Sequence, residues 1–224
     1  MAIDSTSSQF EASADSRITV RQQLRSATHA AHVRLNHHPM LAGLTRPGFS
    51  LDAYQHILAA YYPFYAAVEP AILAVLSQTN DLGFSYIERR KLPWLIEDLL
   101  ALGYETENIQ CKRTFAIPAD VAEVIGTLYA IEGSTLGGQV ISRHLAANLG
   151  LTPEQGARFF SGYGANTESH WAAFCAYAET LVDDPRQRER ASFAALQVFN
   201  ALEGQLDDGQ NYFARFAIAA LTSL

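Results

Sequence analysis

The sequence has little cysteine, few basic residues and no long run that is free of charge. Its two cysteines, Cys111 and Cys175, lie far apart and outside any C-x-x-C pattern. This favours reduced thiols and predicts a cytoplasmic protein, with one long-range disulfide left open as an alternative. The 16 Lys and Arg residues against 23 Asp and Glu give a formal net charge of −7. That balance argues against nucleic-acid binding, which requires a basic face.

Signals for secretion and for membrane insertion are also missing. The longest stretch without Asp, Glu, Lys or Arg covers residues 53–68, which is 16 residues and short of a membrane span. We therefore expect no membrane association and predict a helix that is buried on most sides. Residues 1–17 lack the basic and apolar regions of a signal peptide and are predicted to be a disordered lead-in. Residues 18–224 are expected to form one domain.

Helical periodicity dominates what is present, and strand alternation is scarce. With 49% hydrophobic and 11% aromatic residues, the chain can form a sizeable core. The pattern predicts an all-α, single-domain bundle of six to eight helices. Four expected helices cover residues 18–37, 51–77, 84–103 and 118–148. Pro93 interrupts or restarts the third of these, and Gly150 ends the fourth. Further helices are expected to begin at Thr152-Pro153, at Asn166 or Thr167 and at Asp184-Pro185. Residues 39–47 are expected to form a loop.

The segment LYAIEGSTLGGQV, residues 128–140, places three glycines within six positions of a predicted helix. Each glycine in a helix costs roughly 1 kcal/mol relative to alanine, so the glycines need a reason. On a helical wheel one narrow stripe of small residues results, made of Gly126, Ala130, Gly133 and Gly137. Two explanations stay open: a close crossing of two helices, or a planar cofactor on the stripe with Ser134 and Thr135 as the nearest hydroxyls.

The segment LRSATHAAHVRLNHH, residues 24–38, contains four of the seven histidines. His29 and His32 are one helical turn apart, and Arg25 lies two turns before His32 on nearly the same face. This arrangement suits a macrocycle whose metal takes a neutral imidazole while a peripheral carboxylate meets the guanidinium. His37 and His38 fit a capping role at the helix end. Because no Glu-x-x-His or His-Glu-x-x-His pattern occurs, heme is a better candidate than free metal.

These two segments resemble those of the heme oxygenases, in particular the biliverdin-forming bacterial enzymes associated with phytochromes. LRSATHAAH resembles the proximal segment, and this resemblance implies that His32 is the axial ligand of the iron of heme b. GSTLGGQV resembles the distal helix, which implies that Gly133, Gly137 and Gly138 lie against the heme. A weaker likeness extends over residues 18–206.

The resemblance also assigns the residues around the heme. Arg25, His29 and Arg143 occupy the basic positions that meet the heme propionates. Animal members carry an aspartate after the first distal glycine, where it orders the waters that deliver protons, and the present sequence has Ser134 there. The predicted catalytic residues are accordingly Ser134 and Thr135, as supports of a water chain, and Gly133, which gives steric room.

A second departure from the family's pattern lies beside the proximal ligand. The glutamate that often follows the proximal histidine by four residues is Asn36 here. We expect the amide oxygen of Asn36 to accept a hydrogen bond from the imidazole N–H group of His32.

The activity implied by the resemblance is cleavage of heme at a meso carbon, with O2 and electrons, to biliverdin, CO and ferrous iron. Heme would be both substrate and cofactor. Since no Gly-x-Gly-x-x-Gly follows a strand, electrons are expected from a separate ferredoxin or reductase, and a bilin-accepting phytochrome is an expected partner. Three alternatives stay open: a heme storage or sensor protein without turnover, a hydrolase like those of thiamin salvage with Cys175 as nucleophile, and a regulatory partner of a photoreceptor.

Overall fold

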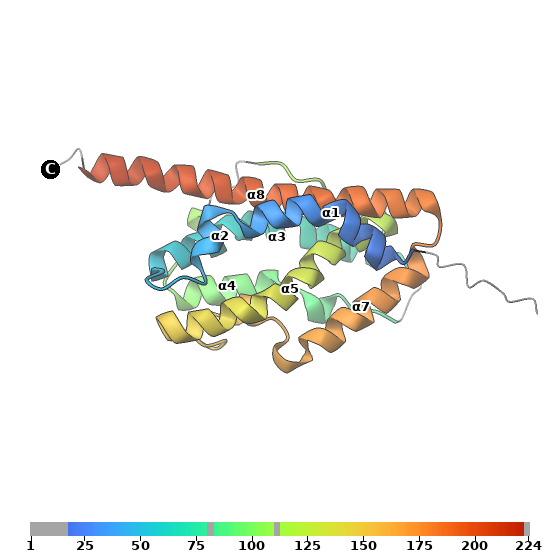
Figure 1. Ribbon diagram of the computed structural model, residues 1–224, viewed down its shortest axis with the longest axis horizontal. Helices are drawn as coiled ribbons and strands as arrows, with labels where there is room; N and C mark the ends of the chain where they lie inside the picture. The colour runs from blue at the N-terminus through green and yellow to red at the C-terminus, as the bar shows by residue number, and fades with distance from the viewer. Residues whose placement is uncertain (1–17, 80–82, 110–112, 222–224) are drawn as a thin grey trace, which may run out of the picture.

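The computed structural model describes residues 18–79, 83–109 and 113–221 (Figure 1). Within these residues every regular element is helical, which confirms the predicted all-α class. The α-helices are α1 (Val20–Asn36), α2 (Pro39–Gly43), α3 (Leu51–Leu76), α4 (Leu92–Ala101), α5 (Val121–Leu149), α6 (Arg158–Ser161), α7 (Thr167–Leu181) and α8 (Pro185–Leu221). Short 3₁₀ helices cover η1 (Ile87–Arg89), η2 (Thr106–Asn108) and η3 (Gly164–Asn166). The predicted lead-in and Cys111 lie outside the described residues.

Helix α1 begins with a capping box. The Gln22 N–H group donates to the Thr19 hydroxyl, and the Thr19 N–H group donates to the Gln22 side chain. The helix buries one face against α8, and the members of that face recur at helical spacing: Val20, Leu24, Thr28, Ala31 and Leu35. At the other end, His37 forms the C-cap and its ring Nδ1 lies 2.8 Å from the Val33 carbonyl oxygen. The capping role predicted for His37 is therefore confirmed.

Helix α3 is the central apolar helix of the bundle. Its N-cap is Ser50, as predicted, and the Ser50 hydroxyl accepts a hydrogen bond from the Ala53 N–H group. Pro63 and Pro70 both lie inside the continuous helix. Among the described residues α3 alone is long and apolar enough to span a membrane, and most of its apolar window is buried in the bundle. That burial is what the sequence predicted for this segment.

Helix α8 runs along one side of the whole bundle (Figure 1). Asp184 caps it by accepting the N–H groups of Arg186 and Gln187, directly before Pro185, as predicted. The helix packs against α5, α1 and α3. It therefore holds α1 and α5, the two helices singled out by the sequence, in one framework.

Other predicted boundaries were wrong. Residues 39–43 form the short helix α2 and not a loop, because the His38 ring accepts the Met40 N–H group as an N-cap. Helix α5 begins after Asp120, whose carboxylate accepts the Glu123 N–H group, and not at Pro118.

The helix predicted from Thr152 is instead a turn. The Thr152 carbonyl accepts N–H groups from Gln155 and Ala157, and Gly156 has a φ of 89°, which no right-handed helix accommodates. The interruption or restart that was predicted at Pro93 is confirmed: η1 ends at Arg89, and α4 begins at Leu92 with Pro93 in its first turn.

Candidate functional site

Helices α1 and α5 touch at one point and then separate. The side chains of Thr28 on α1 and Tyr129 on α5 lie close together at this crossing, and the Thr28 hydroxyl donates to the Leu24 carbonyl. In Figure 1 both helices run from right to left, and α5 inclines away from α1 toward its C-terminal end. His32 and Gly133 each lie four residues, one helical turn, beyond the crossing. The two predicted heme-binding segments therefore leave a common contact point in the same direction.

On α1, His32 lies in this diverging region with an exposed edge. Its ring packs edge-on against Phe199 of α8, with 5.6 Å between ring centroids. Partial burial, together with the charge of His29, lowers the pKa of His32 below its usual value of 6.5. The neutral imidazole is therefore favoured, and this is the form that ligates a metal.

Asn36 contacts His32, as predicted, but with the opposite polarity. The Asn36 side-chain nitrogen lies 3.2 Å from His32 Nε2, so the amide donates to the imidazole and does not accept from it. The reason is geometric: four residues apart on one helical face, the amide nitrogen reaches the ring nitrogen.

On α5, Gly133 and Gly137 face the region into which α1 and α5 diverge. A Cβ atom at Gly137 would meet nothing within 4 Å, and one at Gly133 would meet only the Trp171 ring at 3.5 Å. Leu136 and Val140, on the same side of the helix, are exposed apolar residues. This half of α5 thus carries an apolar face without bulky groups at its centre, and a flat ligand can lie against it.

The other glycines have a different role. A Cβ atom at Gly126 would overlap the backbone of Ala191 in α8, and one at Gly138 would lie 2.6 Å from the Phe160 carbonyl oxygen. The close-crossing explanation is therefore confirmed at Gly126, while Gly137 has the open space that the planar-cofactor explanation requires. The prediction that Gly138 lies against the heme was wrong, because the side of Gly138 that lacks a side chain packs against Phe160 of α6.

The two predicted hydroxyls lie on different sides of α5. The Ser134 hydroxyl is exposed and donates to the Ile131 carbonyl at 2.8 Å, while the buried Thr135 hydroxyl donates to the Glu132 carbonyl at 2.6 Å. Thr135 packs toward Gly162, away from the open face. Ser134 also hydrogen-bonds to Tyr65, a fully buried phenol whose pKa is raised, mainly by burial. Ser134 alone of this pair lies near the open face.

The predicted basic residues are exposed along the same two helices. Arg25 lies beside the crossing, close enough to Tyr129 for its charge to lower the pKa of that phenol, whereas burial raises it. His29 is exposed one turn further along α1, and Arg143 is exposed on α5 beyond the glycines. Cations therefore flank the open face near the crossing and toward its far end.

These residues fit a heme. Trp171, which covers Gly133, has an indole N–H group that is buried without a hydrogen-bond partner in the described part of the chain. A ligand or a water can satisfy a buried donor of this kind. The site offers one neutral imidazole, a wall without side chains and peripheral cations, which is the donor set that an iron porphyrin with two carboxylates requires.

Cys175 fits nucleophilic catalysis less well. It is a free, partly buried thiol on α7, and burial raises its pKa. A thiol that ionises less readily is a weaker nucleophile at neutral pH. The structure therefore gives no support to a hydrolase built on Cys175.

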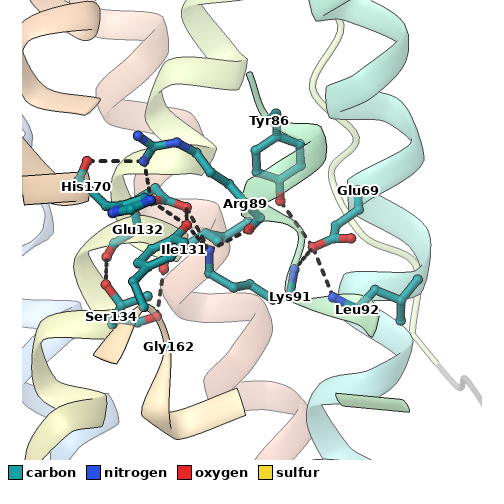
Figure 2. A network of polar contacts seen from close by, with 12 residues as sticks. Glu69, Tyr86, Arg89, Lys91, Leu92, Ile131, Glu132, Ser134, Gly162 and His170 are labelled. Atoms are coloured by element: carbon teal, nitrogen blue, oxygen red, sulfur yellow. Dashed lines mark hydrogen bonds and ion pairs between the residues drawn. The ribbon is translucent and has the colours of Figure 1, made fainter. Parts of the chain in front are cut away.

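A buried network of charges behind α5 escaped the sequence analysis. Glu132, directly before Gly133, is fully buried and bonded to Arg89, Lys91 and Tyr163 (Figure 2). The signal was available: Glu69 and Glu132 are the acidic residues within otherwise apolar helical segments, AAVEPA and LYAIEGS. A buried acid requires a buried partner, so each of them predicts a nearby cation.

Comparisons with known proteins address the family and the fold. A curated heme oxygenase from Xanthomonas campestris pv. campestris (strain 8004) is 32% identical over 109 residues, which cover 47% of this chain and 61% of that protein. The chain thus matches less than two thirds of that relative's length. A crystal structure of NO- and CO-bound heme oxygenase from Neisseria meningitidis superposes with a TM-score of 0.69 at 23% identity, covering 86% of this chain and 92% of that one.

Heme oxygenase from Leptospira interrogans has a TM-score of 0.71 at 16% identity, covering 85% of this chain and 99% of that chain. Heme oxygenase-1 from the cyanobacterium Synechocystis sp. PCC 6803, solved in complex with heme, has a TM-score of 0.69 at 15% identity, covering 92% and 99%. At these identities the likeness shows the fold. The family model for heme oxygenase, however, matches residues 18–206, and the chain therefore belongs to the heme oxygenase family.

Proposed function

We propose that the protein binds heme b between α1 and α5 and cleaves it at a meso carbon, with O2 and electrons, to biliverdin, CO and ferrous iron. The observation that carries this proposal is the divergence of the two helices beyond Thr28 and Tyr129, with His32 exposed on one and Gly137 open on the other. Membership of the family supports the chemistry.

Each residue of the site has a distinct task in this proposal. When bound, heme supplies the iron that activates O2 and the ring that is opened. His32 would hold the iron as a neutral imidazole oriented by Phe199, and the Asn36 amide would release the ring nitrogen that it now contacts. Gly133 and Gly137 leave space above the ring and prevent the side-chain contacts that would block it. The exposed basic residues Arg25, His29 and Arg143 would meet the propionates.

Protons would reach the reacting oxygen through waters ordered by Ser134. Its hydroxyl donates to the Ile131 carbonyl and hydrogen-bonds to Tyr65, so the group is held in one orientation. A held hydroxyl can order a neighbouring water, which is what proton delivery requires in a chain without the distal aspartate. Thr135 is too deeply packed to take part directly.

Electrons would come from a separate ferredoxin or reductase. The described residues contain no strand, so this part of the chain holds no βαβ unit that could bind a flavin or nicotinamide. We further propose a cytoplasmic setting, supported by the free thiol of Cys175. We also propose delivery of the product to a phytochrome, for which the reason is the resemblance of the two motifs to those of phytochrome-associated enzymes.

Hemin titration of the apo-protein, followed by reductant under air, tests the proposal. We expect a sharp Soret band at one hemin per chain, its loss on reduction in the presence of O2, and a bilin on product chromatography. A protein that binds hemin but keeps its Soret band after prolonged reduction would show that the turnover part of the proposal is wrong.

One observation favours a second candidate, heme storage or sensing without turnover. The side chain after the first distal glycine is Ser134, a neutral group whose hydroxyl is already engaged with the Ile131 carbonyl. Such a group relays protons less readily than a carboxylate. The same reductant experiment separates the two candidates, because storage predicts a stable ferrous complex and no bilin.

A further inference from the structure

The charge network behind α5 centres on the Glu132 carboxylate. Lys91 Nζ donates to Glu132 Oε1 at 2.8 Å, and Arg89 Nη1 donates to Oε2 at 2.9 Å. The Tyr163 hydroxyl lies 2.8 and 2.9 Å from the two oxygens and 2.6 Å from Lys91 Nζ. Figure 2 shows Arg89 and Lys91 reaching Glu132 from the η1–α4 segment, and Tyr163 belongs to the loop after α6. The carboxylate is thus satisfied entirely by other elements of the fold.

A second buried carboxylate, that of Glu69, holds the segment that carries the cations. Glu69 of α3 accepts the N–H groups of Lys91 and Leu92, the Tyr86 hydroxyl and the Arg90 guanidinium. The two carboxylates and three cations leave the network with one net positive charge. The segment that carries the cations is therefore held by α3 as well as by α5.

The network lies beside the open face of α5. Glu132 is followed directly by Gly133 and Ser134, and the Thr135 hydroxyl donates to the Glu132 carbonyl. The charges of Glu69 and Glu132 act on Tyr65, the phenol that hydrogen-bonds to Ser134. The field of the network consequently reaches the hydroxyl nearest the open face.

The cost of burying these charges calls for an explanation. Glu132 is inaccessible to solvent and Lys91 is 1% exposed, and burial lowers the pKa of Lys91 although Glu132 opposes this effect. An apolar set of similar volume generally packs at least as stably as a buried ion pair. Stability alone thus gives no reason for charge at this place.

We propose that Glu132 is a positioning residue: held by Lys91 and Arg89, it fixes residues 131–134 of α5 and sets the electrostatic potential at the heme face that α5 covers. This inference rests on the proposed binding of heme. Removing the negative charge of Glu132 makes the net charge of the network more positive, whereas removing a cation makes it more negative. The two changes should act on bound iron with opposite sign.

The matched variants are Glu132→Gln and Lys91→Met. Both are near in size to the native side chain, and they change the network charge by +1 and −1. The other charged or titratable groups around it, namely Tyr65, Tyr86, Tyr163, His170 and Arg158, stay as they are. Glu123→Gln is the control, because Glu123 lies on the same helix in an exposed ion pair with Arg190, nine residues before Glu132.

The experiment measures the reduction potential of the hemin complex and the C–O stretching frequency of its ferrous CO complex. We expect Glu132→Gln to raise the potential and lower the frequency, because positive charge stabilises ferrous iron and strengthens back-donation to CO. Lys91→Met should shift both quantities the other way, and Glu123→Gln should leave both at the wild-type values. Thermal unfolding of each apo-protein checks that it folds, and Arg89→Met replaces Lys91→Met if that variant does not.

The outcomes separate this inference from the function on which it rests. Shifts of the same sign in both variants, or no shift beyond that of the Glu123→Gln control, would overturn the electrostatic role of Glu132. If wild-type protein bound no hemin, the proposed function would fail before the variants were compared. If the wild-type protein degraded heme but the two variants did not shift in opposite directions, the proposed function would stay supported and only this inference would be wrong.

Discussion

At the scale of single residues, the site depends on how His32 is held. Phe199 contacts the ring edge and Asn36 contacts Nε2, so the imidazole has support from α8 and from its own helix. The neutral form is favoured by partial burial and by His29. Metal binding therefore requires the Asn36 amide to give up its contact with Nε2, the ring nitrogen that carries the lone pair.

Replacing His32 by Ala tests the ligand. We expect the dissociation constant of hemin to rise by about tenfold or more, since loss of even a supporting group near a metal costs that much. Optical titration with hemin measures it. His37→Ala is the control, because His37 lies on the same segment but bonds its ring to the Val33 carbonyl. Equal affinities of the His32→Ala and His37→Ala variants for hemin would show that His32 is not the iron ligand.

Asp98 on α4 gives a prediction about pH. Its buried carboxylate accepts the N–H groups of Arg158 and Phe159, and desolvation still raises its pKa from 3.8 to about 6. Because the folded pKa is the higher one, the contribution of protonation to stability is full below pH 3.8 and is lost as pH rises through about 6. The two-unit difference amounts to about 3 kcal/mol.

Urea unfolding of wild type and Asp98→Asn between pH 4 and 7 checks this sign. The free energy of unfolding of wild type, relative to the variant, should increase as pH falls through this window. A difference that shrinks toward low pH would mean that the backbone N–H groups outweigh desolvation at Asp98.

Residue spacing predicted a histidine-bearing face on α1 and a stripe of small residues on α5, because helical geometry follows from sequence. The choice of His32, Gly133, Gly137 and Gly138 as heme contacts came from the resemblance to heme oxygenases. The partner of each buried charge did not follow. Glu132 meets Lys91 and Arg89, more than 40 residues away, through the packing of three elements. Sequence alone states that Glu132 needs a partner, and only the fold identifies it.

At the scale of elements, α5 combines two kinds of surface in one helix. Its first half is buried nearly all round and crosses α8 at Gly126, while its second half has one open face at Gly137. The glycine pattern is similar in both halves. The two halves therefore respond oppositely to the same substitution.

Replacing each of these two glycines by alanine distinguishes the packed half of α5 from the half with an open face. Gly126→Ala should lower the free energy of unfolding by about 2 kcal/mol or more, because the new Cβ overlaps the Ala191 backbone. Gly137→Ala meets open space and should raise it by up to about 1 kcal/mol through helix propensity. Chemical denaturation measures both. An equal loss in the two variants would contradict the division of α5.

Helix ends were predictable where local side chains cap them. Ser50 and Asp184 cap as expected, and Gly150 ends α5 with a left-handed φ of 66°. The Thr152-Pro153 start failed because the backbone turns at Gly156, whose carbonyl accepts the Tyr54 hydroxyl from α3. A contact across 102 residues decided that segment, and local signals cannot report it.

At the scale of the whole molecule, α8 ties the two walls of the site together. It packs against α1, which carries His32, and against α5, which carries the glycines. Phe199 of α8 itself touches His32. A ligand bound between α1 and α5 would therefore add contacts to elements that α8 already connects.

Heme binding should accordingly stabilise the entire fold. A ligand at 100 times its dissociation constant stabilises the native state by about 2.7 kcal/mol when it binds only that state. We expect calorimetry of wild type to show an unfolding temperature that rises with hemin, and no such rise for His32→Ala. A comparable rise in the variant would mean that hemin binds elsewhere on the surface.

The most direct measurement of the central claim is a crystal structure of the hemin complex. The account predicts iron bonded to the His32 imidazole, with the porphyrin lying along Gly133 and Gly137 and its propionates directed at cations of α1 and α5. Iron bound by another residue, or a space between α1 and α5 closed by side chains, would contradict it.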